Sequence, residues 1–240
     1  MDPLDVAARL APTGALRVVV NLGNPVLATG TPEDPAGVTV ALARELARRL
    51  DRPLDLRCVD AARLSLAALV HGEADVAFLA AEPARAREVR FTRAYLTIEG
   101  VYVAPAGRGP ATAAEVDRPG TRVGVKEGSA YDLHLSRSLQ EAEVVRGAEG
   151  LQVYLDEGLE VGAAIRQPAT AFVEDGGAGG GAHRVLEPAF MQIRQALAVP
   201  LDRDDEAVAL VDGLVGELLA SGFVRAELAR SGQDPDLAVD

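Results

Sequence analysis

The chain has 240 residues and a formal net charge of −12, from 24 Lys and Arg against 36 Asp and Glu. Hydrophobic residues make up 48% and charged residues 25%, which is a globular composition and excludes disordered, collagen-like and coiled-coil chains. A nucleic-acid interface needs clustered cations, so no nucleic-acid partner is expected for so acidic a chain. Cys58 is the only cysteine, which excludes an internal disulfide and a multi-cysteine metal site.

The sequence shows neither a membrane span nor a secretory signal. No apolar run approaches the ~18 residues that a membrane span requires, so membrane insertion is not expected. Residues 1–13 alternate charged and small residues, without a basic start, an apolar stretch and a cleavage site. We therefore expect a cytoplasmic protein, or a periplasmic or extracellular one if a signal was removed.

The first part of the chain predicts strands alternating with helices. Apolar or alternating runs predict strands at 16–20, 54–59 and 75–80. Leucines that recur every four residues predict an amphipathic helix over 38–50, and 61–70 predicts a second one. This alternation indicates parallel βαβ units, whose ligands bind beyond the carboxyl ends of the strands.

A similar pattern follows between residues 105 and 195, so the chain predicts two α/β units. Strands are expected at 101–104, 122–125, 143–146 and 161–165, and helices from 128, at 151–155 and at 167–173. The Gly-rich run 175–182 predicts a surface loop, 191–199 an extended segment, 207–218 and 223–228 helices, and the tail from Gln233 a loose end. Two extended links, 101–104 and 196–199, predict a two-stranded hinge on which two lobes close around a ligand.

Five segments then carry a resemblance to a known family. They are LRVVVNLGNP (16–25), GVTVALARELARRL (37–50), GEADVAFLAAEPARAREVRFTRAY (72–95), RVGVKEGSAYDLHL (122–135) and GFVRAELARSG (222–232). Their order and spacing resemble the bacterial extracellular solute-binding proteins of family 3, which have the type II periplasmic-binding fold. The resemblance implies an α/β protein with a first lobe of 1–100 plus 200–240 and a second lobe of 101–199.

The resemblance implies a carboxylate clamp at Arg85, which follows the third strand. A planar guanidinium offers a carboxylate two parallel donors. The alternative is a salt bridge from Arg85 to Glu82 or Glu88. Glu82 stands where the family usually has Thr or Ser, so it either pairs with Arg85 or meets a donor on the ligand.

Three further positions are candidate ligand contacts. Ser129 and Ala130 open a helix whose N–H groups attract anions, although Ser129 also suits a plain N-cap. Gln167 stands where the family has the aspartate that holds a ligand ammonium. Asn24 and Ala62 stand near the places of the family's stacking aromatics, and Asn24 is a candidate either for ligand contact or for turn chemistry.

In departing from the family pattern, this chain has neither the aspartate at 167 nor the stacking aromatics near 24 and 62. The absence of these residues favours a small polar, carboxylate-bearing ligand without a cationic amine, or one that uses Glu82 for the amine. Glu99 lies inside an apolar segment, so it needs a partner or a wet cleft and is a candidate for ligand contact or a hinge salt bridge. Lys126 is expected on the surface near Glu127. His71, His134 and His183 are far apart, so no metal site is expected.

The leading interpretation is a solute-binding protein with a small-molecule ligand, no cofactor and, if it is exported, an ABC permease as partner. The alternative is a lyase resembling cyclohexadienyl dehydratase, with Glu82 and Glu99 as general acid and base. A carboxyl group in a water-poor cleft has a raised pKa, which suits that role. An intracellular ligand sensor or partner-binding module is a third possibility.

Overall fold

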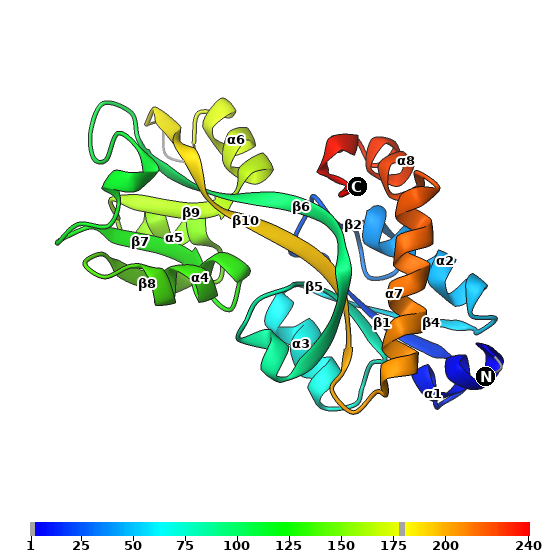
Figure 1. Ribbon diagram of the computed structural model, residues 1–240. Helices are drawn as coiled ribbons and strands as arrows, with labels where there is room; N and C mark the ends of the chain where they lie inside the picture. The colour runs from blue at the N-terminus through cyan, green and yellow to red at the C-terminus, as the bar shows by residue number, and fades with distance from the viewer. Residues whose placement is uncertain (1–2, 178–180) are drawn as a thin grey trace. The chain divides into compact units, whose positions relative to one another are not determined.

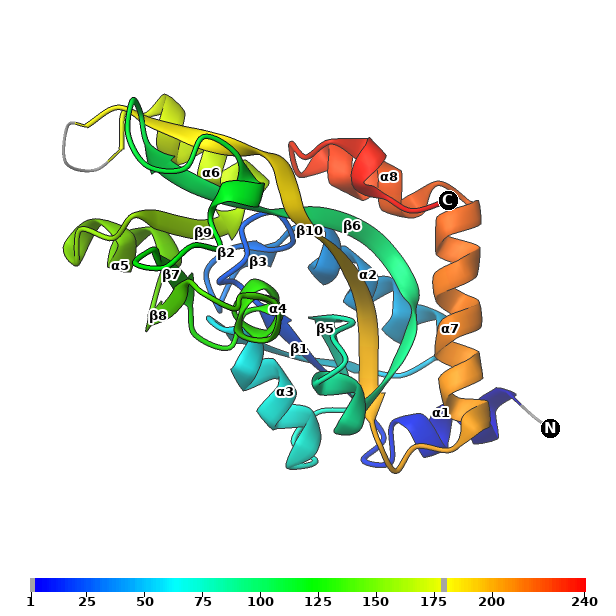
Figure 2. The ribbon, with the colours of Figure 1, turned by 60° about the vertical axis from the view of Figure 1, so that its left-hand side comes forward.

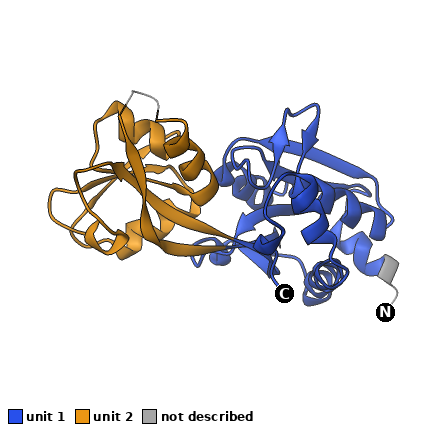
Figure 3. Ribbon diagram, turned by 90° about the horizontal axis from the view of Figure 1, so that it is seen from above, with its two compact units in different colours: residues 1–97, 194–240 blue, residues 98–193 orange. Residues whose placement is uncertain are grey.

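The computed structural model describes residues 3–177 and 181–240, so residues 1–2 and the centre of the Gly-rich run lie outside the described chain. The chain divides into two compact units, which Figure 3 colours separately. Unit 1 comprises residues 1–97 and 194–240, and unit 2 comprises residues 98–193. The chain therefore passes between the units twice, once within β6 (Val89–Pro105) and once within β10 (His183–Pro200). The sequence predicts these boundaries after residues 100 and 199.

Unit 1 contains a mostly parallel sheet with the strand order β4-β1-β5-β10. β1 (Leu16–Asn21) pairs in parallel with both β4 (Leu54–Val59) and β5 (Val76–Ala80), while β10 is antiparallel to β5. Parallel neighbours require crossover connections, which α2 (Val38–Arg49) and α3 (Ala62–Val70) supply (Figure 1). The predicted βαβ arrangement and the α/β fold class are confirmed.

The helices of unit 1 form because their apolar residues recur at helical spacing. In α2, Val38, Leu42 and Leu46 share one face and are buried. α7 (Asp205–Ala220) and α8 (Phe223–Arg230) follow β10, and α1 (Pro3–Leu10) lies beside the start of α7 (Figure 2). Among the described residues no single helix has the length and apolarity to cross a membrane, and only α7 and α8 taken together, bent by 68°, meet those criteria.

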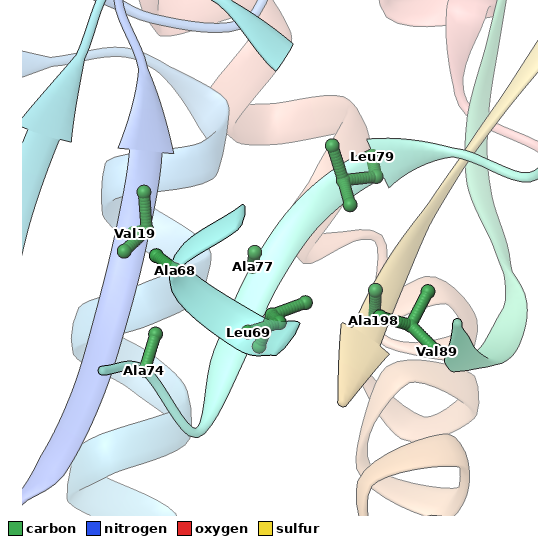
Figure 4. Close-up of a cluster of buried hydrophobic side chains, with 8 residues drawn as sticks. All are labelled: Val19, Ala68, Leu69, Ala74, Ala77, Leu79, Val89 and Ala198. Carbon is green, nitrogen blue, oxygen red and sulfur yellow. The ribbon is translucent and has the colours of Figure 1, made fainter. Parts of the chain in front are cut away.

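A cluster of small and branched apolar residues joins α3 to the sheet. Figure 4 shows Ala68 and Leu69 of α3 beside Val19 of β1 and Ala77 of β5. Leu79, at the end of β5, belongs to the same cluster. Burying a branched side chain of this kind contributes about 1.5–3 kcal/mol, so this contact fixes the strand ends that α3 connects.

The C-terminal tail is docked on unit 1, so the expectation of a loose end is wrong. Residues Pro235–Leu237 form a short 3-10 helix. Ala238 then forms an antiparallel bridge with Leu96, and the Val239 N–H donates to the Tyr95 carbonyl at 3.3 Å. Ala238 is buried, so the tail extends the β-pairing of β6 rather than fraying into solvent.

Unit 2 repeats the architecture with the strand order β6-β9-β7-β8, which is the second half of one eight-stranded sheet. β7 (Arg122–Lys126) is parallel to β8 (Glu143–Gly147) and β9 (Val161–Ile165), and β6 is antiparallel to β9. Its helices are α4 (Ala130–Ser138), α5 (Gly150–Asp156) and α6 (Arg166–Glu174). α5 lies close to the sheet because Gly150 has no side chain, and a Cβ there would lie 2.5 Å from the Ala163 carbonyl oxygen.

A buried ion pair ties the start of β5 to the rest of unit 1. Asp75 is 0% exposed and accepts from Arg17 at the main-chain N (3.0 Å) and at Nη2 (2.7 Å). The Arg203 Nη2 donates to the same carboxylate at 3.2 Å, from the turn that precedes α7. One carboxylate therefore joins β1, β5 and the C-terminal part of unit 1.

We predict that Asp75→Ala lowers the free energy of unfolding by about 3–5 kcal/mol, because it leaves two partly buried guanidiniums without their counter-charge. Urea denaturation measures this loss. Asp55→Ala removes an exposed carboxylate from β4 and is the matched control, with an expected change within about 0.5 kcal/mol. Equal losses in the two variants would show that the Asp75 ion pair does not stabilise unit 1.

Candidate functional site

The carboxyl ends of the parallel strands in unit 1 carry three of the predicted site residues. Asn24 follows β1, while Glu82 and Arg85 follow β5. Parallel strands end at the same edge of a sheet, and this edge is where open α/β sheets bind ligands. All three residues are buried, so the edge presents polar groups that are held out of bulk water.

Arg85 lies in the short 3-10 helix Arg85–Arg87 and is only 2% exposed. Its Nη1 donates to the carbonyl oxygen of Ala80, the last residue of β5, at 3.3 Å. Burial lowers the pKa of Arg85 to about 10, and the charge of Glu82 opposes this shift. The guanidinium is therefore still charged at neutral pH, in a place where a charge is costly unless it meets an anion.

The loop after β5 brings Glu82 to the same place. The Glu82 N–H donates to the Ala80 carbonyl at 2.9 Å, and the Glu82 carbonyl accepts from the Ala86 N–H at 3.0 Å. Glu82 is 7% exposed, so the loop holds a carboxylate and a guanidinium in one buried turn. This arrangement agrees with both roles expected of Glu82, the partner of Arg85 and a contact for the ligand.

Asn24 performs turn chemistry. Its Oδ1 accepts from the Val26 N–H at 3.2 Å, and its carbonyl accepts from the N–H groups of Leu27 and Ala28 at 3.0 Å each. An asparagine side chain that bonds its own backbone two residues on is a standard way to start a turn. Asn24 therefore shapes the loop at this edge, whether or not it also contacts a ligand.

In unit 2 the loop after β7 leads into the start of α4, where Ser129 is the N-cap. Its Oγ accepts from the Asp132 N–H at 3.0 Å, and the Asp132 carboxylate accepts from the Gly128 N–H at 2.8 Å. Arg146 Nε donates to Asp132 at 3.0 Å and holds it in place. Ala130 is the first residue of α4 and is buried, so this helix start is rigidly built.

Gln167 is the second residue of α6, directly beyond the end of β9. Its Oε1 is buried and has no hydrogen-bond partner within the described part of the chain. Such an acceptor costs about 1–3 kcal/mol when it stays unsatisfied, so it marks a place where a donor from outside the chain would bind favourably.

Glu99 belongs to an ion-pair network that the sequence analysis only partly anticipated. Its Oε1 accepts from Gln192 Nε2 at 2.7 Å, and its Oε2 accepts from Arg166 Nε. Arg166 also holds Glu187 through two bonds of 2.6 and 2.9 Å. The Gln192 hydrogen bond, with help from Arg166, lowers the pKa of Glu99 against the opposing effect of burial. The lyase alternative expects a raised pKa at Glu99, and this expectation is therefore wrong.

Arg166 is a residue of this network that the sequence did not single out. It is the first residue of α6, and the pairing of Gly100 with Ile165 brings it beside Glu99. The available signal was a basic residue at the carboxyl end of a predicted strand, next to the candidate Gln167. Its two carboxylate partners come from distant parts of the sequence, so no local sequence pattern predicts this pairing.

Lys126, His134 and His183 have structural contacts, whereas His71 is exposed. The Lys126 side chain is 14% exposed and pairs with Glu149 at 2.5 Å, so the expected exposure beside Glu127 is wrong. The ring of His134 stacks on Phe190, and His183 Nδ1 lies 2.9 Å from the Tyr154 hydroxyl. In residues 3–177 and 181–240 no group of three or more His, Cys, Asp or Glu side chains is placed to hold a metal ion.

The structure thus gathers the predicted residues at two sheet edges, one in each unit. Asn24, Glu82 and Arg85 lie at the carboxyl edge of the unit 1 sheet. Ser129 and Ala130 follow β7, and Gln167 follows β9, at the carboxyl edge of the unit 2 sheet. Each edge combines polar side chains with backbone donors. Groups of these kinds can form hydrogen bonds with a small polar molecule.

Comparison with solved structures finds the same fold throughout the chain. A mutant of ArgBP from T. maritima has 20% sequence identity and a TM-score of 0.75, with 95% of this chain and 99% of that chain covered. An amino acid ABC transporter substrate-binding protein from Streptococcus pneumoniae bound to L-arginine has 13% identity and a TM-score of 0.75, with coverages of 94% and 97%. The ancestral amino acid-binding protein AncCDT-1, a precursor of cyclohexadienyl dehydratase, has 16% identity and a TM-score of 0.74, with coverages of 95% and 99%. At these identities the likeness shows the fold alone.

Comparison with curated proteins gave no match. The sequence model of the bacterial extracellular solute-binding proteins, family 3, matches residues 16–228, which is most of the chain. This match agrees with the two α/β units and with the polar groups at their carboxyl edges. The chain belongs to the bacterial extracellular solute-binding proteins of family 3.

Proposed function

We propose that this solute-binding protein captures a small polar molecule through a carboxylate, and that Arg85 is the group that binds this carboxylate. The observation that carries the proposal is the burial of the Arg85 guanidinium at the carboxyl edge of the unit 1 sheet. A buried guanidinium forms strong, paired hydrogen bonds with a carboxylate because little water competes for its donors. The charge of Glu82 reduces the cost of holding Arg85 there when no ligand is bound.

The contacts from unit 2 are assigned to Ser129, Ala130 and Gln167. The first turn of α4 offers backbone N–H groups and the positive end of a helix dipole, both of which favour an anion. Gln167 Oε1 offers a buried acceptor to a neutral donor on the ligand, such as a hydroxyl group. These groups suit an acid that also carries a hydroxyl or amide group.

We further propose that the ligand lacks a cationic α-amine. Gln167 is neutral, and the nearby carboxylates Glu99 and Glu187 are both engaged by Arg166. An ammonium group binds favourably where a carboxylate can neutralise it, and a neutral amide does this poorly. Glu82 is the remaining candidate partner for an amine on the ligand.

The proposed role is delivery of this solute to an ABC permease. One structural neighbour is described as an amino acid ABC transporter substrate-binding protein, which supports a transport role for this fold. Such a role has the protein acting outside the cytoplasm. The lyase alternative gains no support at Glu99, because a carboxyl group whose pKa is lowered is a poor general acid at neutral pH.

We predict that a bound carboxylate raises the melting temperature and that Arg85→Gln removes this rise. At a hundredfold excess over Kd the ligand adds about 2.7 kcal/mol of stability. For a chain of this length that corresponds to roughly 5–10 °C. A thermal-shift screen of small hydroxy, keto and dicarboxylic acids measures the effect. Arg87→Gln, which removes an exposed arginine from the same 3-10 helix, is the matched control and retains the rise. An undiminished rise in Arg85→Gln would refute the assignment.

Paired ligands test the absence of an amine. We expect the 2-hydroxy acids lactate and malate to bind about tenfold or more tightly than alanine and aspartate, because Gln167 cannot neutralise an ammonium group. Gln167→Asp is expected to reverse this order, since a carboxylate repels a second anion and binds an ammonium. Isothermal titration calorimetry measures both affinities. Preference of the wild type for amino acids, lost in Glu82→Gln, would instead assign the amine to Glu82.

The pH dependence of stability tests the state of Glu99. Because its folded-state pKa lies below the unfolded value, its contribution is present above about pH 4.3 and is lost as the pH falls through the folded-state pKa. Glu99→Gln should therefore lower the unfolding free energy by on the order of 1 kcal/mol at about pH 7, with the difference from wild type shrinking as the pH is lowered toward about 3. Urea unfolding at a series of pH values measures this. A difference that grows on acidification would show that Glu99 has a raised pKa.

A further inference from the structure

Unit 1 contains a cavity of about 590 Å³ that lies outside the candidate ligand site. It is formed by β6, β10, α7, α8 and the C-terminal segment, and none of its lining residues is a candidate ligand contact. Its volume is within the range of small-molecule pockets in proteins, which is about 300–1,000 Å³. Its charged lining consists of Arg93, Arg194, Arg225, Asp212 and Asp240.

Arg93 is held in place by Asp212. Its Nε and Nη2 donate to Asp212 Oδ2 at 3.1 and 2.7 Å. The third nitrogen, Nη1, lies against α7 at Gly216, where an added Cβ would approach it to 2.7 Å. Glycine destabilises a helix interior relative to alanine, so α7 accepts a cost at the position that makes room for this guanidinium.

Arg194 and Arg225 supply the other two guanidiniums. The Arg194 side chain is exposed and has no hydrogen bond or ion pair with any residue that the structure describes. Arg225 pairs with Asp236 and Asp240 at 2.8 Å each, but these carboxylates are 85% and 99% exposed. Ion pairs this exposed to water are weak, so an incoming anion can replace Asp240 at little cost.

We propose that this cavity binds a small organic polyanion that carries two or more carboxylate or phosphate groups. Its lining has an excess of cationic over anionic side chains, in a chain whose net charge is −12. Arg194 and Nη1 of Arg93 bind one acidic group, because guanidinium donors match the oxygens of carboxylate and phosphate. Arg225 binds a second group once Asp240 releases it.

The test is isothermal titration calorimetry at constant ionic strength, with citrate and pyrophosphate as separate probes. We expect at least one probe to bind, and Arg194→Gln to weaken that binding by about tenfold or more. Asp240→Asn should strengthen it severalfold, because Arg225 then loses its competing carboxylate. Binding of citrate alone or pyrophosphate alone supports the proposal and identifies the preferred acidic group.

Arg44→Gln is the matched control, because it removes an exposed arginine of unit 1, on α2, that does not line the cavity. Binding should be unchanged in this variant. Arg194→Gln should weaken binding equally in an Arg85→Gln background, where the solute site cannot contribute. Absence of binding by both probes would overturn the proposal. So would equal losses in Arg44→Gln and Arg194→Gln, which indicate nonspecific attraction, or a loss confined to Arg85→Gln, which indicates binding at the solute site.

Discussion

Parallel strand pairing is the constraint on which the candidate site depends. Strands that run in parallel cannot be joined by a tight turn, so α2 and α3 return the chain to the starting edge of the sheet each time. All the carboxyl ends then lie at one edge, and residues as distant in sequence as Asn24 and Arg85 belong to the same edge. Unit 2 obeys the same rule through β7, β8 and β9.

The two edges differ in how their charges are balanced. In unit 1 a buried guanidinium, Arg85, follows the strand together with a single buried carboxylate, Glu82. In unit 2 one guanidinium, Arg166, is shared between Glu99 and Glu187, so that cluster carries an excess of negative charge. Under the proposed function, an anionic ligand is therefore attracted to Arg85 and to the start of α4 rather than to Arg166. Arg166, the cation at the carboxyl end of β9, is thus already neutralised by carboxylates of its own unit.

Local patterns predicted most of the fold, because helix and strand periodicities depend on neighbouring residues. The leucine spacing of α2 and the strand–helix alternation are of this kind. The docked tail was missed because its place depends on one bridge between Ala238 and Leu96, which are far apart in sequence. The same reason explains the site: the positions of Arg85 and Ser129 follow from local motifs, whereas the pairing of Arg166 with Glu99 depends on the register of β6 against β9.

An anion approaches this acidic chain against the chain's long-range electrostatic field, so short-range donors have to supply any attraction. Beyond a Debye length of about 8–10 Å, salt screens that repulsion and exposed attractive charges alike. Arg85, at 2% exposure, is shielded from this screening, and the fold bears the cost of its desolvation before any ligand arrives. Arg194 is exposed and bears no such cost, so salt screens its charge more strongly than that of Arg85. Burial thus distinguishes Arg85, whose interactions salt screens little, from Arg194, whose interactions depend on the ionic strength.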